Sequence, residues 1–291
     1  MNQKKKKELA LEIISRLKKE YPDAGCTLDY NEAWKLLVSV RLAAQCTDAR
    51  VNVIVEKLYE KFPNVDALAD ARVEDIEAIV RPCGLGRTKA RDISACMKVL
   101  KEKYQGKVPN QFKQLLDLPG VGRKSANLIM GDVFGEPAIV TDTHCIRLVN
   151  RMGLVDGIRE PKKVEMELWK IIPPEEGSDF CHRLVFHGRE ICTARTKPFC
   201  DRCCLNDICE RSGVDEPEKL AEKEKAAKKE TAAKKKAKAE TKPRKTAGAQ
   251  KAEGKTAGAR KTGTQKAKGK TAGARKTGTQ KTGARNIQEG E

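Results

Sequence analysis

The sequence predicts an all-α protein followed by a basic tail of low complexity. Apolar residues recur at helical spacing as far as about residue 210, for example along residues 34–42. Gly and Pro interrupt these runs at short intervals, which favours many short helices. No alternating run is long enough for a strand, and we interpret the β-branched residues 138–141 as an extended connector.

The positive charge of the chain is concentrated in its last quarter. Residues 211–291 contain 24 Lys and Arg against 10 Asp and Glu, a net +14 of the total +18. The segment KTAGARKTGTQ occurs twice, at residues 255–265 and 270–280. These repeats have no apolar face to offset the entropy of ordering, so we expect disorder beyond a transient helix at 218–240. We expect the tail, residues 213–291, to add nonspecific, salt-sensitive nucleic-acid binding.

The N-terminus does not predict secretion or a membrane anchor. Four lysines, Lys4 to Lys7, precede an amphipathic stretch at residues 9–17 instead of an uninterrupted apolar run. We therefore expect a cytoplasmic protein with no membrane span. In that compartment the 11 cysteines are expected to be buried apolar residues, metal ligands or reactive thiols.

Residues 112–131, FKQLLDLPGVGRKSANLIMG, predict two helices joined by a glycine turn. The first helix is expected to end at Leu118 and the second to begin after Gly122. Gly120 and Gly122 permit positive φ, and the N–H groups at the second helix's start suit a DNA phosphate. Val121 is expected to pack inward between the helices. The pattern is that of a helix-hairpin-helix, and the alternative is a plain corner between two helices.

Lys124 and Asp142 are the candidate catalytic residues. Lys124 falls in the first turn of the second helix, where the helix dipole disfavours an ammonium and favours a nucleophilic amine. The alternative for Lys124 is a solvated side chain beside phosphate. Asp142, in the string VTDTH, either caps the following helix or stabilises positive charge at a sugar C1′ and assists proton transfer.

A C-terminal cysteine cluster has the spacing C-x7-C-x2-C-x5-C. Four thiolates so close in sequence fit a tetrahedral zinc ion or a [4Fe–4S] cluster, and the spacing alone does not choose between them. A fifth cysteine, Cys204, is a spare. Arg195 and Lys197 lie in the first loop of the cluster and are suited to contact phosphate. The predicted ligands are Cys192, Cys200, Cys203 and Cys209.

The order LPGVGRK, VTDTH and cysteine cluster resembles the endonuclease III family of helix-hairpin-helix DNA glycosylases. The similarity extends from about residue 8 to residue 210 and leaves the tail outside. It also includes AQCTD at residues 44–48 and LVFHG at residues 184–188. The family's first cysteine gap is usually six residues, whereas here it is seven.

The resemblance implies a two-lobed fold with a [4Fe–4S] cluster. A six-helix barrel would span residues 26–136, and an iron–sulfur domain would combine residues 1–25 with residues 137–212. The active site would lie in the cleft between the lobes, with Lys124 and Asp142 on opposite walls.

The resemblance also implies a bifunctional enzyme of base excision repair. A damaged nucleotide is flipped out of the duplex, Lys124 displaces the base at C1′, and the Schiff base permits β-elimination at the abasic site. Asp142 stabilises the developing charge. Gln45 and Leu85 match the positions that fill the vacated hole, and His144 matches a residue facing DNA. The expected DNA-contacting residues are Gln45, Leu85, Gly120, Val121, Gly122, Arg123, His144, Arg195 and Lys197.

The expected substrate is double-stranded DNA with oxidised pyrimidines or abasic sites, bound by a monomer near the nucleoid if the source is prokaryotic. One alternative is an adenine-mismatch glycosylase, but that family usually lacks a lysine at the position of Lys124 and adds a C-terminal recognition domain. Another is a non-enzymatic helix-hairpin-helix DNA-binding protein with a structural metal.

Overall fold

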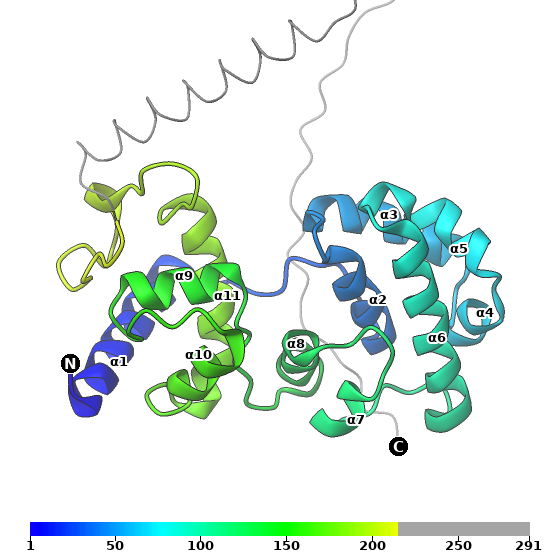
Figure 1. The fold of residues 1–291 in the computed structure, drawn as a ribbon, viewed down its shortest axis with the longest axis horizontal. Helices are drawn as coiled ribbons and strands as arrows, with labels where there is room; N and C mark the ends of the chain where they lie inside the picture. The colour runs from blue at the N-terminus through cyan, green and yellow to red at the C-terminus, as the bar shows by residue number, and fades with distance from the viewer. Residues whose placement is uncertain (215–291) are drawn as a thin grey trace, which may run out of the picture. The chain divides into compact units, whose positions relative to one another are not determined.

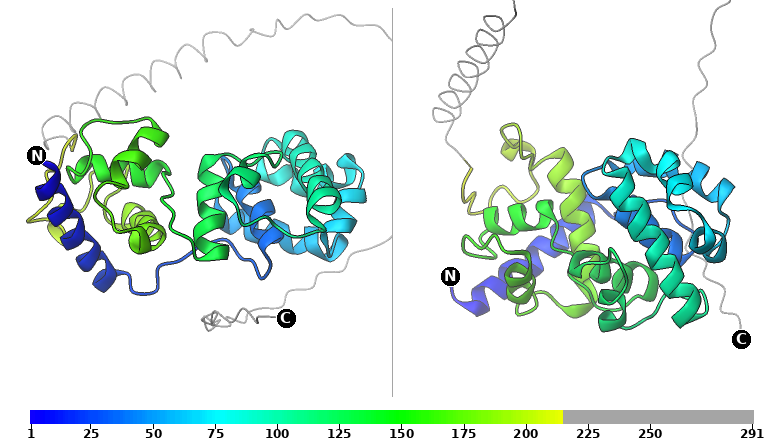
Figure 2. Two further views of the ribbon diagram at one scale, coloured as in Figure 1. Left: turned by 90° about the horizontal axis from the view of Figure 1, so that it is seen from below. Right: turned by 45° about the vertical axis from the view of Figure 1, so that its right-hand side comes forward.

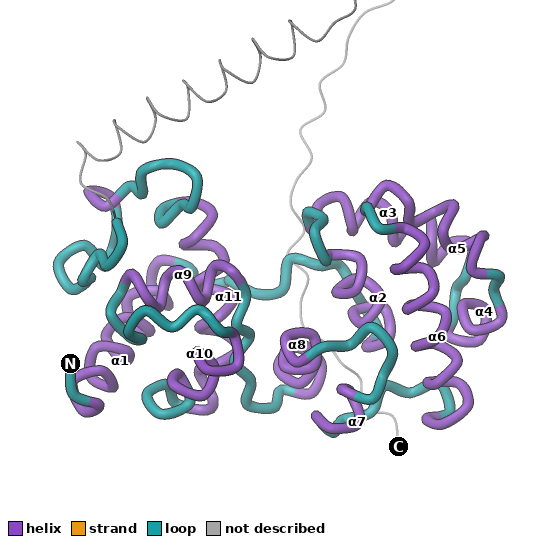
Figure 3. The backbone as a smooth tube through the Cα atoms, viewed as in Figure 1, coloured by secondary structure: helices purple, strands orange, loops and turns teal. Residues whose placement is uncertain are grey.

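The structure, a computed structural model, describes residues 1–214. These residues form eleven α-helices and three short 3₁₀ turns and contain no strand, which confirms the all-α class (Figures 1 and 3). None of these helices is long and apolar enough to span a membrane. The repeats and the helix expected at residues 218–240 lie outside the described residues. The elements are α1 (Gln3–Glu20), α2 (Ala33–Ala43), α3 (Asp48–Lys61), α4 (Val65–Asp70), α5 (Val73–Val80), η1 (Arg81–Cys83), α6 (Gly86–Tyr104), α7 (Phe112–Leu116), α8 (Arg123–Phe134), α9 (Thr143–Arg151), α10 (Pro161–Leu168), η2 (Pro174–Glu176), α11 (Gly177–Glu190) and η3 (Cys200–Arg202).

Helices α2 to α8 bury their apolar faces in one core. The longest, α6, contributes Ile93, Met97 and Leu100, whose spacing places them on one face of the helix. That face packs against α4 and α5. The periodicity of the sequence therefore predicts which side chains of α6 are buried.

A second core is built from both ends of the described chain. Ile13 and Leu17 of α1 pack with Leu148 of α9 and with Phe180 and Leu184 of α11. Figure 2 shows α1, in dark blue, beside the green helices of this core in both views. The apolar face of α1 is therefore covered by segments that are synthesised much later.

Helix α8 connects the two cores. Leu128 packs against both of them, and the Asn127 side-chain amide donates to the carbonyl of Ile139 at 3.0 Å. Asp132, near the end of α8, bonds Nε2 of His182 on α11 at 2.7 Å. The two cores are thus held together by apolar and polar contacts along one helix. The domain limits expected from the sequence stay a prediction.

Candidate DNA-binding site and cysteine pocket

The glycine turn between α7 and α8 is a tight hairpin. Helix α7 ends at Leu116, two residues earlier than expected, because Pro119 disfavours helical geometry at the preceding Leu118. Val121 N–H donates to the Leu118 carbonyl at 3.1 Å, and Val121 is partly buried against the first core. Gly120 has φ +77°, a conformation that L side chains rarely adopt.

An ion pair packs against Gly120 of this hairpin. Arg41 Nε donates to Asp92 Oδ2 at 2.7 Å, and both side chains lie against Gly120. A Cβ added to Gly120 would lie 2.9 Å from Asp92 Cβ and 3.1 Å from Arg41 Cδ. The glycine is therefore required by both its backbone angle and its close neighbours. At Gly122 an added Cβ would meet nothing within 4 Å.

The side chain of Arg123, the first residue of α8, forms an ion pair with a residue of α10. Its guanidinium donates to both oxygens of Glu165 on α10, at 2.6 and 2.7 Å, and stacks over the Phe112 ring. The Glu165 side chain is only 2% exposed. The expected contact of Arg123 with DNA stays a prediction. Lys124, the next residue, is exposed.

Asp142 caps α9, as the alternative interpretation of the sequence anticipated. Its Oδ1 accepts from the N–H of Cys145 at 2.7 Å. A cap of this kind uses one of the two carboxylate oxygens, so the cap and a role beside the sugar are compatible.

The pKa of His144 is affected by the charges of both candidate catalytic residues. Burial lowers its pKa, and the positive charges of Arg147, Arg189 and Lys124 act in the same direction, whereas Asp142 opposes them. Its Nδ1 lies 3.2 Å from a guanidinium nitrogen of Arg147. Lys124 and Asp142, from α8 and the start of α9, are therefore both within electrostatic range of His144.

Sequence reasoning missed Asp48, the first residue of α3. It accepts hydrogen bonds from Thr27 and from Arg189 of α11, each at 2.6 Å. Burial opposes its charge, but these hydrogen bonds outweigh burial and lower its pKa, and Lys124 contributes in the same direction. Asp48 thus adds a negative charge near Lys124. The partner Arg189 lies 141 residues away in sequence, so no local pattern identifies the pair.

Gln45 and Leu85 share an unusual backbone. Both are exposed and both lie in the left-handed region, with φ of 59° and 51°. Non-glycine residues adopt this conformation rarely and at some cost in free energy. The two residues expected to fill the hole in the duplex are therefore exposed, and each lies in a turn with a strained backbone.

The four predicted ligand cysteines line one small hollow that is open to solvent. Its walls include the apolar residues Met152, Ile191 and Leu205. Main-chain N–H groups point at two of the sulfurs, from Leu205 to Cys203 and from Arg211 to Cys209, each at 3.4 Å. Within residues 1–214, however, no three Cys, His, Asp or Glu side chains are arranged to hold a metal ion.

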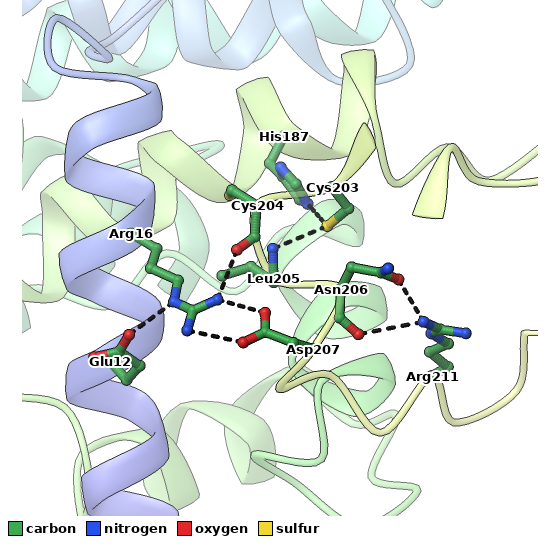
Figure 4. A network of polar contacts seen from close by, with 9 residues as sticks. All are labelled: Glu12, Arg16, His187, Cys203, Cys204, Leu205, Asn206, Asp207 and Arg211. Carbon is green, nitrogen blue, oxygen red and sulfur yellow. Dashed lines mark hydrogen bonds and ion pairs between the residues drawn. The ribbon is translucent and has the colours of Figure 1, made fainter. Parts of the chain in front are cut away.

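The neighbouring Cys204 is used differently. It does not line the hollow, and its carbonyl accepts from Arg16 of α1 at 3.0 Å, as Figure 4 shows. In the same view, His187 of α11 points at Cys203, with Nε2 3.4 Å from the sulfur. Arg195 and Lys197 are exposed in the loop between Cys192 and Cys200.

Comparison with known proteins identifies relatives of this chain among DNA repair proteins. Residues 38–174 match the model of the HhH-GPD superfamily base excision DNA repair proteins. The chain is 42% identical to endonuclease III of Synechocystis over 205 residues, which is 70% of this chain and 93% of that protein. It is 38% identical to endonuclease III of Escherichia coli K12 over 200 residues, 69% of this chain and 94% of that protein.

Solved structures give the same result. A trapped covalent intermediate of an endonuclease III with DNA superposes with a TM-score of 0.67 at 40% identity, covering 70% of this chain and 96% of that one. A thermostable thymine-DNA glycosylase shares the fold, with a TM-score of 0.63 at 22% identity, covering 72% of this chain and 97% of that one.

Proposed function

The chain belongs to the endonuclease III family, within the HhH-GPD superfamily of base excision DNA repair proteins, and on this premise we propose how its residues act. It is a base-excision DNA glycosylase and abasic-site lyase that binds damaged DNA. We propose that oxidised pyrimidines are the bases it removes and that Lys124 is its nucleophile. Because the relatives described above are bacterial, we place its work on nucleoid DNA in the cytoplasm.

In the proposed reaction, the Lys124 amine attacks C1′ of a flipped nucleotide and the bond from C1′ to the base breaks. The base leaves with a proton, and the product is an aminal in which C1′ is bonded to both the lysine nitrogen and O4′. The C1′–O4′ bond then breaks, O4′ takes a proton, and the lysine nitrogen and C1′ form a Schiff base. Loss of a proton from C2′ then expels the 3′ phosphate by β-elimination, which nicks the strand. Asp142 would stabilise the positive charge that develops at C1′ and assist the proton transfers.

One observation carries this assignment. The charges of Lys124 and Asp142 both act on His144, although the two residues come from different elements. We infer that this lysine and this carboxylate, at the starts of α8 and α9, both face a nucleotide bound at the hairpin, where they would suit attack at a sugar carbon. His144 would face the DNA, and Gln45 and Leu85 would enter the space that the flipped nucleotide leaves.

We further propose that the cysteine hollow holds a [4Fe–4S] cluster, ligated by Cys192, Cys200, Cys203 and Cys209. The donor set supports this, because four sulfurs line one hollow, with main-chain N–H groups directed at two of them. When bound, the cluster would cross-link the loop that carries Arg195 and Lys197, which would hold those cations toward phosphate. Visible absorption and iron content of the purified protein distinguish this cluster from zinc.

Borohydride trapping tests the nucleophile. The protein is incubated with duplex DNA containing thymine glycol or an abasic site, and borohydride reduces any Schiff base to a stable covalent complex. The wild-type protein is expected to form this complex and the Lys124→Ala variant to form none. The Lys113→Ala variant, which changes an exposed lysine of α7, is the matched control and should trap as wild type does.

Two outcomes would contradict the proposal. If no complex forms with either substrate, the enzyme lacks the lysine Schiff-base chemistry. If Lys124→Ala still traps, another amine is the nucleophile. Base release without trapping would indicate the adenine-mismatch type of glycosylase.

A further inference from the structure

A fully buried lysine lies beneath the two turns that carry Gln45 and Leu85. Lys89 of α6 has a relative exposure of 0%, the same as the aliphatic residues of the first core. A buried ammonium is costly unless its hydrogen bonds are satisfied. The contacts of Lys89 therefore identify what this side chain is for.

The Lys89 ammonium joins the ends of two separate elements. Its Nζ donates to the carbonyl of Leu42, in the last turn of α2, and to the carbonyl of Cys83, the last residue of η1, both at 2.8 Å. Carbonyls at helix ends lack a partner within the helix and carry partial negative charge. A cation placed between two such ends satisfies both of them.

Each of these carbonyls lies two or three residues before an exposed residue with a strained backbone. Gln45 lies three residues after Leu42, and Leu85 lies two residues after Cys83. The main-chain N–H of Lys89 also donates to the Leu85 carbonyl, at 3.0 Å. Through its ammonium, Lys89 thus bonds to the start of each turn, at the carbonyls of Leu42 and Cys83. Through its main-chain N–H it also bonds to Leu85 itself.

We propose that Lys89 is a positioning residue that fixes Gln45 and Leu85 relative to each other for insertion into the duplex. The inference rests on the proposed function, because it assumes that these two side chains enter the vacated space. Without the ammonium, each turn would keep its own local hydrogen bonds, and the side chains of Cys46 and Cys83 would remain in contact, but the hydrogen bonds that join the two turns through Lys89 would be lost.

The environment of Lys89 is consistent with a fixed structural charge. Burial lowers its pKa, while the nearby thiols of Cys83 and Cys46 act in the opposite direction. Arg41, the remaining charged group near it, also lowers the pKa but is itself paired with Asp92. A methionine has a similar length and would fill the same space, but it cannot donate to the two carbonyls.

Fluorescence of a base analogue measures this positioning directly. The DNA is a duplex with a non-cleavable abasic-site analogue and 2-aminopurine in the opposite strand at that site. Saturating wild-type protein is expected to change the fluorescence as Gln45 and Leu85 enter the stack. With Lys89→Met, the amplitude at saturation should fall by roughly half or more. Lys98→Met, an exposed lysine on the same helix, is the control and should keep the wild-type amplitude.

A mutant cycle separates positioning from a general loss of stability. In the wild-type background, Lys89→Met is expected to slow excision of thymine glycol from duplex DNA by roughly tenfold. In a background that already carries Gln45→Ala and Leu85→Ala, it should slow excision by less than about twofold, because the residues it positions are gone. An equal loss in both backgrounds would overturn the inference.

The remaining outcomes also decide the matter. If Lys89→Met does not fold, Lys89→Gln replaces it in the same cycle, because its shorter neutral side chain keeps a donor for the fold but cannot join both carbonyls as the ammonium does. If neither variant folds, Lys89 supports the whole barrel and the inference is wrong. If the wild-type protein excises no base, the proposed function fails, whereas the fluorescence experiment requires no bond cleavage and still tests Lys89.

Discussion

Arg123 and Glu165 form a two-pronged ion pair that ties the start of α8 to α10, with hydrogen bonds of 2.6 and 2.7 Å. The pair fixes the residue next to Lys124 against the second core. The Glu165 side chain is 2% exposed and that of Arg123 is 37% exposed. Loss of the partner would therefore cost more free energy at the buried carboxylate than at the guanidinium, which water can reach.

Replacement of Arg123 should therefore destabilise the fold. Arg123→Met leaves the Glu165 carboxylate buried without its cation, and we expect a loss of about 3 kcal/mol in the free energy of unfolding, measured with urea. The double variant Arg123→Met/Glu165→Leu should recover most of this loss, since an apolar pair needs no counter-charge. A loss below about 1 kcal/mol in the single variant would mean that the pair behaves like an exposed one.

The two glycines of the hairpin should respond differently to alanine. Gly120→Ala combines positive φ with a Cβ 2.9 Å from Asp92 Cβ, and we expect a loss of about 1–3 kcal/mol in unfolding free energy. Gly122→Ala meets nothing within 4 Å at φ −98° and should change stability by less than about 0.5 kcal/mol. Thermal unfolding of both variants checks this difference. Equal losses would show that the Arg41–Asp92 support is unimportant.

His144 should make the folded state less stable in mild acid. Its folded pKa is lowered, chiefly by burial, so below an unfolded pKa of about 6.5 the unfolded chain binds the proton more readily. Stability should therefore begin to fall as the pH drops through about 6.5 and continue to fall toward the lower folded pKa. His144→Asn cannot titrate and should show a shallower fall in urea unfolding over this range. Parallel curves for the two proteins would contradict the pKa shift.

The adjacent cysteines Cys203 and Cys204 provide a matched pair for the cluster. Cys203 lines the hollow and Cys204 does not. Cys203→Ser is expected to remove most of the visible absorption and bound iron, whereas Cys204→Ser should retain both. Retention in Cys203→Ser together with loss in Cys204→Ser would mean that the loop rearranges to use the spare cysteine.

The tail should contribute to DNA affinity but not to chemistry. Deletion of residues 213–291 removes most of the positive charge of the chain, so nonspecific DNA binding should weaken and depend less steeply on salt concentration. Single-turnover excision at saturating enzyme should be almost unchanged. A collapse of the single-turnover rate would place the tail within the catalytic unit.

Local sequence patterns predicted much of the fold, including the hairpin beside the candidate site, whereas the roles of the site residues stay predictions. Periodicity located the buried faces of the helices, and the glycine turn located the hairpin, because both depend on residues that are neighbours in sequence. The length of α7 was wrong by two residues, since the effect of Pro119 on Leu118 was not taken into account.

What the sequence did not predict depends on distant partners. Lys89 sits in the polar string GRTKAR and resembles an exposed lysine, yet its partners are carbonyls of Leu42 and Cys83. Arg123 resembles a phosphate contact, yet its guanidinium bonds Glu165, 42 residues away. Such contacts are set by how helices pack, and helix packing is not encoded in a local window.

The division of the second core between both ends of the chain has a consequence for biosynthesis. Helix α1 leaves the ribosome first, but most of the residues that form the second core with Ile13 and Leu17 follow from Ile139 onward. At synthesis rates of about 5–20 residues per second, this leaves the apolar face of α1 uncovered for on the order of ten seconds, while the helices of the first core are already synthesised. A chain that stalls before α11 would therefore have a folded first core and an α1 whose apolar face is exposed. We expect ribosome-associated chaperones to bind such a chain preferentially.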